Sequence, residues 1–274
     1  MNFLTFDIED YHHLLDIPGL SEQYDERKSI IEKETMNILN MLEKHNKKAI
    51  FFVLGEVAER FPELINLIAE KGHVLGSHSH SHILHKDMTD TEFTQDLIKS
   101  CKAIEKVCGK KVICYRAPGF SMQKDFYHRY EIIRKAGIIY DFSLFQGSAS
   151  HGGVDIKEVN IINFDTKFGS VKSFPFLKSN IFGLSLPLFG GGYFRLTPLF
   201  FLKSALKKNK NIMTYFHPRD FCNLQPRLKG LSLIRYFKAY YGLAGASKKL
   251  EYVVRSNNWS GINLIKGEKI ERNY

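Results

Sequence analysis

The chain has 274 residues, of which 44% are hydrophobic and 13% aromatic. This length and apolar content allow a sizeable buried core, which excludes a mainly disordered chain, and no apolar run reaches the about 20 residues of a membrane-spanning helix. Lys and Arg number 39 against 29 Asp and Glu, a formal net charge of +10. Such a charge favours a polyanion or a membrane surface as a partner, or else forms a solvated basic surface.

The cysteines and the N-terminus both indicate the cytoplasm. The four cysteines contain no CxxC pair, which predicts buried thiols in a reducing compartment. The chain starts MNFLTFDIED, without a basic segment followed by a long apolar one, so we expect no secretory signal.

Short apolar runs alternate with helix-like segments. The strand-like runs are 2–6, 49–54, 74–77, 112–115, 138–142 and 211–216, and the helix-like segments are 29–44, 57–70, 89–107, 124–136 and 198–208. A capping-box pattern of Thr89 and Glu92 begins the third of these helices. This alternation predicts an α/β fold with a parallel sheet.

The alternation changes after residue 145. Residues 145–171 are richer in Gly and Ser and predict an irregular insertion or a β-hairpin. Three glycines precede Tyr193 and Arg195 in the run SLPLFGGGYFRLTP, which predicts a shaped loop. From residue 231 the chain is basic, aromatic and helix-like, so we expect one domain with a C-terminal extension.

Polar residues of metal-binding type follow several predicted strands. They are Asp7, Glu9 and Asp10 after the first strand, His78, His80, His82 and His85 after the third, Arg116 after the fourth, Asp141 at the end of the fifth, and His217 after the last. In an α/β barrel the catalytic groups lie at the carboxyl ends of the strands. A site at that end of the sheet is therefore predicted.

The histidine-rich run GHVLGSHSHSHILH is the densest of these clusters. Three residues separate His78 from His82, so one helical turn would place both on one face. A carboxylate from the first strand would complete a three-ligand site with an open water position, as in catalytic zinc sites. The alternative is a polar loop of solvated imidazoles.

The motifs together resemble the polysaccharide deacetylases, carbohydrate esterase family 4, and specifically the cytoplasmic branch whose first motif reads D-x-E-D. The matching segments are TFDIEDYHH, AIFFVLGEVAERFPELI, GHVLGSHSHSH, YRAPGFS, YDFS, GGGYFR and YFHPRDF, which stand in this order within residues 5–221. The resemblance implies a distorted (β/α) barrel of about seven strands. Residues 1–225 would form this catalytic barrel, and 226–274 a helical extension packed on or beside it.

The resemblance also implies a role for each matching residue. Asp7 corresponds to the general base, and Arg116 to the arginine that orients it. His78 and His82 correspond to the two histidine ligands of the metal. His217 corresponds to the general acid that protonates the leaving amine.

The first and third motifs depart from the common pattern of the family. Most members have two adjacent aspartates, one the base and one a ligand, whereas here Ile8 separates Asp7 from Glu9. Alternate residues of an extended strand share a face, so Glu9 is the favoured carboxylate ligand and Asp10 the alternative. The run RAPGFS is also unusual, which leaves open which backbone N–H near 118–120 binds the oxyanion.

The metal and the substrate contacts complete the predicted site. Two histidines, a carboxylate and a water suit Zn²⁺, with Fe, Co, Ni and Mn as alternatives. The expected substrate-binding residues are His12, Pro118, Phe120, Asp141, Tyr193 and Arg195. For Asp141 the alternatives are support of the base or a cap on its strand, and for Tyr193 packing on the barrel rim.

The predicted function is hydrolytic removal of an N-acetyl group from a sugar of a surface polysaccharide or lipopolysaccharide precursor, in the cytoplasm. The alternatives are hydrolysis of another non-peptide C–N bond and a non-catalytic module that binds glycan or anionic lipid. The basic, aromatic segment 235–255 predicts either contact with the inner face of the membrane, which would suit a lipid-linked oligosaccharide, or a final helix that covers the barrel. The chain has no recognised nucleic-acid motif, so no nucleic acid is expected.

Overall fold

Seven strands form the central sheet, in the order β1-β2-β3-β4-β5-β7-β6. The computed structural model describes residues 1–13, 25–156, 161–181 and 183–266. Neighbouring strands are parallel from β1 to β7, whereas β6 and β7 form an antiparallel hairpin. The strands are β1 (Thr5–Ile8), β2 (Ile50–Val53), β3 (Val74–Ser77), β4 (Cys114–Tyr115), β5 (Tyr140–Asp141), β6 (Ile162–Thr166) and β7 (Gly169–Ser173), with a separate hairpin of β8 (Ser179–Ile181) and β9 (Leu184–Leu186). This mostly parallel α/β sheet confirms the predicted fold class.

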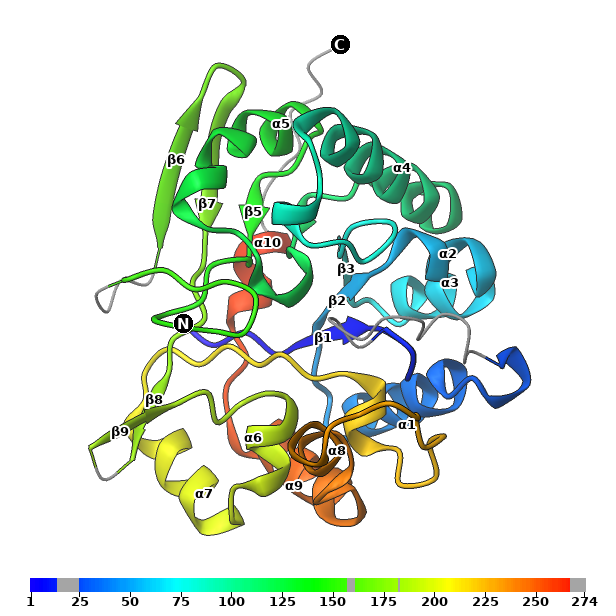
Figure 1. Cartoon of the computed structure of the whole chain (residues 1–274), viewed down its shortest axis with the longest axis vertical. Coiled ribbons are helices and arrows are strands. Elements are labelled where there is room, and N and C mark those ends of the chain that lie inside the picture. Colours follow the sequence, from blue (N-terminus) through cyan, green and yellow to red (C-terminus); the bar gives the residue numbers. More distant parts are fainter. Residues whose placement is uncertain (14–24, 157–160, 182, 267–274) are drawn as a thin grey trace.

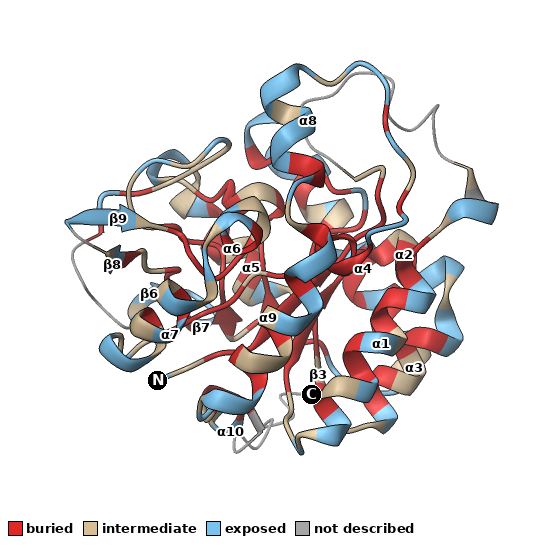
Figure 2. Ribbon diagram, turned by 90° about the horizontal axis from the view of Figure 1, so that it is seen from below, coloured by how far each residue is buried: buried red, intermediate tan, exposed pale blue. Residues whose placement is uncertain are grey.

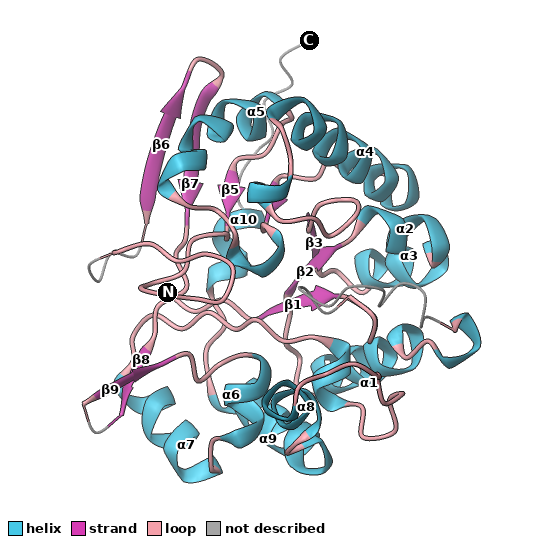
Figure 3. Cartoon of the chain, in the orientation of Figure 1, coloured by secondary structure: helices cyan, strands magenta, loops and turns pink. Residues whose placement is uncertain are grey.

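The helices surround the sheet (Figures 1 and 3). They are α1 (Ile31–Lys44), α2 (Gly55–Arg60), α3 (Pro62–Glu70), α4 (Asp90–Cys108), α5 (Tyr130–Lys135), α6 (Gly191–Leu196), α7 (Leu199–Lys208), α8 (Leu233–Tyr240), α9 (Leu243–Ser256) and α10 (Gly261–Lys266), with 3₁₀ turns that include η4 (Pro118–Phe120), η5 (Lys124–Arg129) and η6 (Pro218–Phe221). In Figure 1 the series α1 to α5 runs around one side of the sheet, and α6 to α9 lie on the other. No helix within these described ranges is long and apolar enough to cross a membrane.

Residues 213–216 close the sheet on the open side of β1. Parallel bridges join Phe3 to Met213 and Phe6 to Phe216, and a further bridge joins Gly190 to Tyr215. The predicted last strand is thus present as isolated bridges. Its position brings residue 217 to the carboxyl end of β1.

The helix predicted at 124–136 is a 3₁₀ turn, η5, followed by the short helix α5, and two other predicted segments also differ from the structure. The single helix expected at 57–70 is divided into α2 and α3, because Pro62 disfavours a helical conformation for Phe61, which has φ −125° and ψ 54°. The expected loop of the three-glycine run instead contains helix α6. Glycine is required at 190, because a Cβ there would lie 2.3 Å from the ring of Tyr215.

The hydrophobic core has two parts: one lies between the sheet and the surrounding helices, and the other lies in the interior of the barrel. Phe51 and Val53 of β2 pack with the helices, whereas Ile50 and Phe52 point into an inner cluster. Residues of α10 join this inner cluster, and Gly261 packs against the ring of Phe3, where a Cβ would lie 2.5 Å away. Helix α10 therefore fills the barrel at the amino end of β1 and leaves the carboxyl ends for a site.

The C-terminal segment contributes helices to different parts of the molecule. Helix α9 packs on η6, α6 and α7, and α8 stands out from the body with most of its surface exposed (Figure 2). Leu233 and Ile234 of α8 are 89% and 71% exposed. The predicted boundary at 225/226 stays a prediction, and residues 267–274 of the predicted extension lie outside the described residues.

Candidate active site

Asp7 is held at the end of β1 by a buried arginine. Its Oδ1 accepts a hydrogen bond of 2.6 Å from Nη1 of Arg116, and both side chains are almost fully buried. Arg116 also donates through Nε to the carbonyl of Phe142 and lies 4.3 Å from the centre of the Phe52 ring. The predicted base and its orienting arginine therefore lie together, and the carboxylate has a fixed direction.

Glu9 meets the two predicted histidine ligands at one point. Its Oε1 lies 2.9 Å from Nε2 of His78 and 2.9 Å from Nε2 of His82. The Nδ1–H of His78 donates to the carbonyl of Arg116 at 2.7 Å, so the Nε2 of the neutral ring carries a lone pair. The buried Nε2 of His82 faces the same oxygen of Glu9, but in a direction that makes no hydrogen bond within the described part of the chain. Two imidazole lone pairs and a carboxylate oxygen facing each other are a donor set that fits a divalent metal.

The protonation of these groups also suits metal binding. Burial disfavours the ionised form of Glu9, but the imidazoles of His82 and His217 outweigh it and hold its pKa well below the usual range. Burial lowers the pKa of His82. An ionised carboxylate and a neutral imidazole are the forms that ligate a metal.

The predicted helical turn between His78 and His82 is wrong. The chain leaves β3 into a non-helical turn in which Ser79 and His82 adopt left-handed conformations, with φ of 73° and 56°. The carboxylate of Asp96, on α4, holds this turn by accepting hydrogen bonds from the backbone N–H of His80 at 2.7 Å and of Ser81 at 3.1 Å. The two imidazoles thus converge through a strained turn, which helical spacing does not describe.

The structure separates the two candidate acids of the first motif. Asp10 lies at the start of α1, where its Oδ1 accepts from the backbone N–H of Tyr11 at 2.8 Å and of Ile30 at 3.2 Å. Its carboxylate therefore serves the backbone of the β1–α1 connection. Glu9 alone of the pair belongs to the cluster with His78 and His82.

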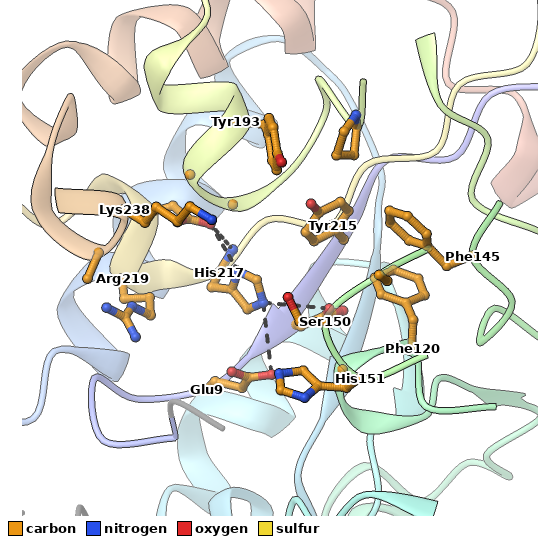
Figure 4. Close-up of a pocket in the computed structure, with 18 of the residues that line it drawn as sticks. Glu9, Phe120, Phe145, Ser150, His151, Tyr193, Tyr215, His217, Arg219 and Lys238 are labelled. Atoms are coloured by element: carbon orange, nitrogen blue, oxygen red, sulfur yellow. Dashed lines mark hydrogen bonds and ion pairs between the residues drawn. The ribbon is translucent and has the colours of Figure 1, made fainter. Parts of the chain in front are cut away.

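His217 faces Asp7 and Glu9, at the carboxyl end of β1, from the opposite side of the site. Its Nε2 lies 3.9 Å from Oδ2 of Asp7 and 3.9 Å from Oε1 of Glu9, while its Nδ1 is 2.9 Å from Oδ2 of Asp220 (Figure 4). Burial lowers the pKa of His217, but the carboxylates of Glu9, Asp220 and Asp7 outweigh it and raise the pKa to about 9. Asp220 escaped the sequence analysis, although its place three residues after His217 was a usable signal.

Arg195 supports this histidine from behind. Its Nε lies 3.3 Å from Oδ1 of Asp220, and its two Nη groups donate to the carbonyls of Ala239 at 2.7 Å and Lys238 at 2.6 Å. Arg195 therefore links α6, α8 and the His217–Asp220 pair. It also lines the cavity, so its contact with the substrate stays a prediction.

A cavity of about 660 Å³ opens over the site. Its wall includes Asp7, Glu9, His78, His82, Arg116 and His217, so the structure brings together all the predicted catalytic and metal-binding residues. Phe120 and Tyr193 also line it, as predicted (Figure 4). Tyr215, Phe145, Ser150 and His151 line it as well. Tyr215 precedes His217 by two residues and so shares its face of an extended chain, whereas the segment 145–151 gave no usable signal.

Three predicted substrate-binding residues do not line the cavity. Asp141 is fully buried and accepts hydrogen bonds from Tyr130 at 2.9 Å and from the hydroxyls of two serines, and burial raises its pKa. Pro118 is buried within η4. His12 stacks on His13, with ring centres 3.9 Å apart, and His13 lines the cavity in its place. Asp141 and Pro118 are thus enclosed by packed protein, whereas His12 is half-buried beside His13.

Comparison with known proteins agrees with this arrangement. Residues 3–139 match the family model described as polysaccharide deacetylase. The chain belongs to this family. Residues 143–265 match a model described as a domain of unknown function (DUF3473). This match assigns no function to the half of the polysaccharide deacetylase that carries His217 and α8.

The curated relatives match only part of the chain. A peptidoglycan-N-acetylglucosamine deacetylase of Bacillus cereus is 40% identical over 75 residues, which are 27% of this chain and 27% of that protein. A peptidoglycan deacetylase of Helicobacter pylori is 31% identical over 107 residues, which are 39% of this chain and 36% of that protein. The chain thus spans roughly a quarter to a third of the length of these two relatives.

One solved structure covers nearly the whole chain. A crystal structure from Mycobacterium smegmatis, assigned to the polysaccharide deacetylases, matches with a TM-score of 0.64 and 19% identity over 96% of this chain and 87% of that one. At this identity the likeness shows the fold. It supports the predicted (β/α) barrel.

Proposed function

We propose that this protein removes the N-acetyl group from a sugar of a surface polysaccharide or lipopolysaccharide precursor by metal-dependent hydrolysis. One observation carries the proposal. The Glu9, His78 and His82 cluster lies in one cavity with the Asp7–Arg116 pair and with His217, the three components that amide hydrolysis requires. The names of the relatives, which refer to deacetylation of N-acetylglucosamine in peptidoglycan, support the same chemistry.

Each side chain has a part in the reaction. Glu9, His78 and His82 would hold the metal, which would supply an acidified water and polarise the acetyl carbonyl. Asp7, oriented by Arg116, accepts the proton of the attacking water. An amine leaves poorly until it is protonated, and the Nε2 of His217 donates that proton because its Nδ1 is committed to Asp220.

The structure narrows the choice of the oxyanion donor. Within the stretch 118–120, Pro118 has no N–H, and the N–H of Phe120 donates to the carbonyl of Ala117 at 3.1 Å. Gly119 remains, and it lines the cavity. We therefore assign its N–H to the developing oxyanion.

The metal we propose is Zn²⁺, on the basis of the two imidazoles and one carboxylate. Metal analysis of the purified protein tests the metal. The reaction is tested by assaying acetate release from N-acetylhexosamines and, separately, hydrolysis of cyclic ureides, the substrates of the alternative C–N hydrolase. Asp7→Asn should keep the metal, and its rate of turnover should fall about 10²–10⁴-fold. His78→Ala should lose both the metal and the activity. Full turnover by Asp7→Asn would overturn the role of the base.

We also propose that the protein works in the cytoplasm and contacts the inner face of the membrane, where a lipid-linked substrate would lie. Helix α8 supports this proposal. Leu233, Ile234 and Phe237 are exposed on it, and Arg235 and Lys238 of the same helix line the cavity. Co-sedimentation with liposomes should increase with the fraction of anionic lipid, and the absence of binding to anionic liposomes would refute the contact.

A further inference from the structure

Arg219 carries an unpaired positive charge in the wall of the cavity. It lies on η6 two residues after His217, its side chain is 95% buried, and it faces the same cavity (Figure 4). Within the described part of the chain, neither its Nη1 nor its Nη2 has a hydrogen-bond partner. A guanidinium stays protonated even where burial lowers its pKa, as here. A buried charge without a partner is costly, so this position calls for an anion.

The carboxylates of the cavity wall are committed to other partners. Asp7 is bound by an arginine, Glu9 faces the histidines, and Asp220 lies between an arginine and a histidine. These are the three acids among the described residues that line the cavity. Asp220 acts on Arg219 electrostatically but accepts no hydrogen bond from its Nη groups, so these hydrogen bonds are left for an anionic ligand.

Helix α8 adds basic side chains to the same wall. Lys238 and Arg235 line the cavity, and Figure 4 shows the ammonium end of Lys238 directed toward the region of His217. Lys238 is exposed, so it can approach a ligand at the mouth while Arg219 stays fixed below. The side of the cavity formed by η6 and α8 is thus positive, in contrast to the acid-rich floor at the end of β1.

We propose that Arg219 and Lys238 form a subsite for an oxyanion of the substrate, a phosphate or a carboxylate attached to or next to the N-acetylated sugar. This inference rests on the proposed deacetylase function and adds the charge of the substrate to it. A guanidinium matches both oxyanions through paired N–H donors. The subsite lies beside His217, so the charged group would fall on the leaving-amine side of the sugar.

The test compares the rate of acetate release from matched substrates. These are a neutral N-acetylglucosamine oligomer, the same sugar carrying a phosphate, and the same sugar linked to a uronic acid. Arg219→Gln should lower the ratio of kcat/KM for the charged over the neutral substrate at least about tenfold, the value of one charge-assisted hydrogen bond. Lys238→Gln should lower it by a smaller factor. The charged substrate that loses more identifies phosphate or carboxylate as the natural group.

Arg227→Gln is the matched control. Arg227 lies in the same region of the chain but is exposed outside the cavity, so this variant removes the same charge and should leave the ratio unchanged. An equal loss on neutral and charged substrates in Arg219→Gln would mean that Arg219 only supports η6, and would overturn the subsite. A wild-type enzyme that prefers the neutral oligomer would overturn it as well and leave the deacetylase function standing.

A binding measurement makes the test independent of turnover. Inorganic phosphate is titrated into the metal-loaded protein by calorimetry. Arg219→Gln should weaken the binding at least about tenfold, whereas Arg227→Gln should match the wild type. Equal binding by Arg219→Gln and the wild type would refute the subsite. Phosphate binding that depends on Arg219 without acetate release from any sugar would refute the deacetylase function alone.

Discussion

Replacing Asp220 by Asn tests how far the reaction depends on the charge behind His217. Asn has nearly the same shape, and its side-chain carbonyl can still accept from Nδ1 of His217, where Oδ2 now lies at 2.9 Å. The substitution therefore keeps the direction of the imidazole and removes the negative charge. Asp220 is one of three carboxylates that raise the pKa of His217 to about 9 against the effect of burial, so the variant should have a lower His217 pKa.

The magnitude follows from the type of hydrogen bond. A charge-assisted hydrogen bond contributes about 1.5–3 kcal/mol and a neutral one about 0.5–1.5 kcal/mol, a difference of about 1–1.5 kcal/mol. If the protonated imidazole in the transition state loses this difference, kcat falls about tenfold. Removing the acid altogether in His217→Gln should cost more, about 10²–10⁴.

The assay is the pH dependence of kcat for acetate release. A general acid must be protonated, so activity falls as the pH rises through the pKa of His217. Because Asp220→Asn lowers that pKa, its alkaline limb should lie at lower pH than that of the wild type. Thermal melts and metal content confirm that the variant is folded and loaded. An alkaline limb that coincides with the wild type, or a loss as large as in His217→Gln, would refute the reasoning.

Three further substitutions address the supports of the site. Asp96→Ala removes the acceptor that holds the His78–His82 turn, and should weaken metal binding about 10–100-fold in a competition titration with a chelator; unchanged affinity would show that the turn holds itself. Asp10→Ala should lower the free energy of unfolding in urea by about 1–3 kcal/mol, because the buried backbone N–H groups of Tyr11 and Ile30 lose their acceptor, while metal content stays the same. Loss of the metal would make Asp10 a ligand after all. Burial raises the pKa of Asp141, so the folded state binds this proton more tightly than the unfolded chain and its stabilising effect is lost as the pH rises above the unfolded value of about 3.9. The free energy of unfolding of the wild type relative to Asp141→Asn should therefore fall with increasing pH, and a constant difference would contradict the assignment.

Motif order and strand periodicity were enough to identify the fold and the residues that meet in the cavity. Buried apolar runs predicted β2 and β3 closely, because a strand covered on both faces has few polar positions. Parallel strands place their carboxyl ends at one edge, so residues that directly follow the strands converge whatever their separation in sequence. Asp7, His78, Arg116 and His217 are brought together for this reason.

Tertiary contacts decided which partners each polar side chain binds, and therefore which role it has. Glu9 and Asp10 are adjacent in the chain, and only the placement of α1 directs one carboxylate to the backbone and the other to the histidines. Asp141 has the chemistry of a binding residue, but the hydroxyls around β5 take up its carboxylate away from the cavity. Arg219 shows the opposite case, because only the packed structure reveals a buried guanidinium that lacks a partner in the described chain. The sequence therefore determined which polar groups reach the site. Packing determined which of these groups are hydrogen-bonded within the protein and which are left for a ligand, because their partners come from elements distant in the chain.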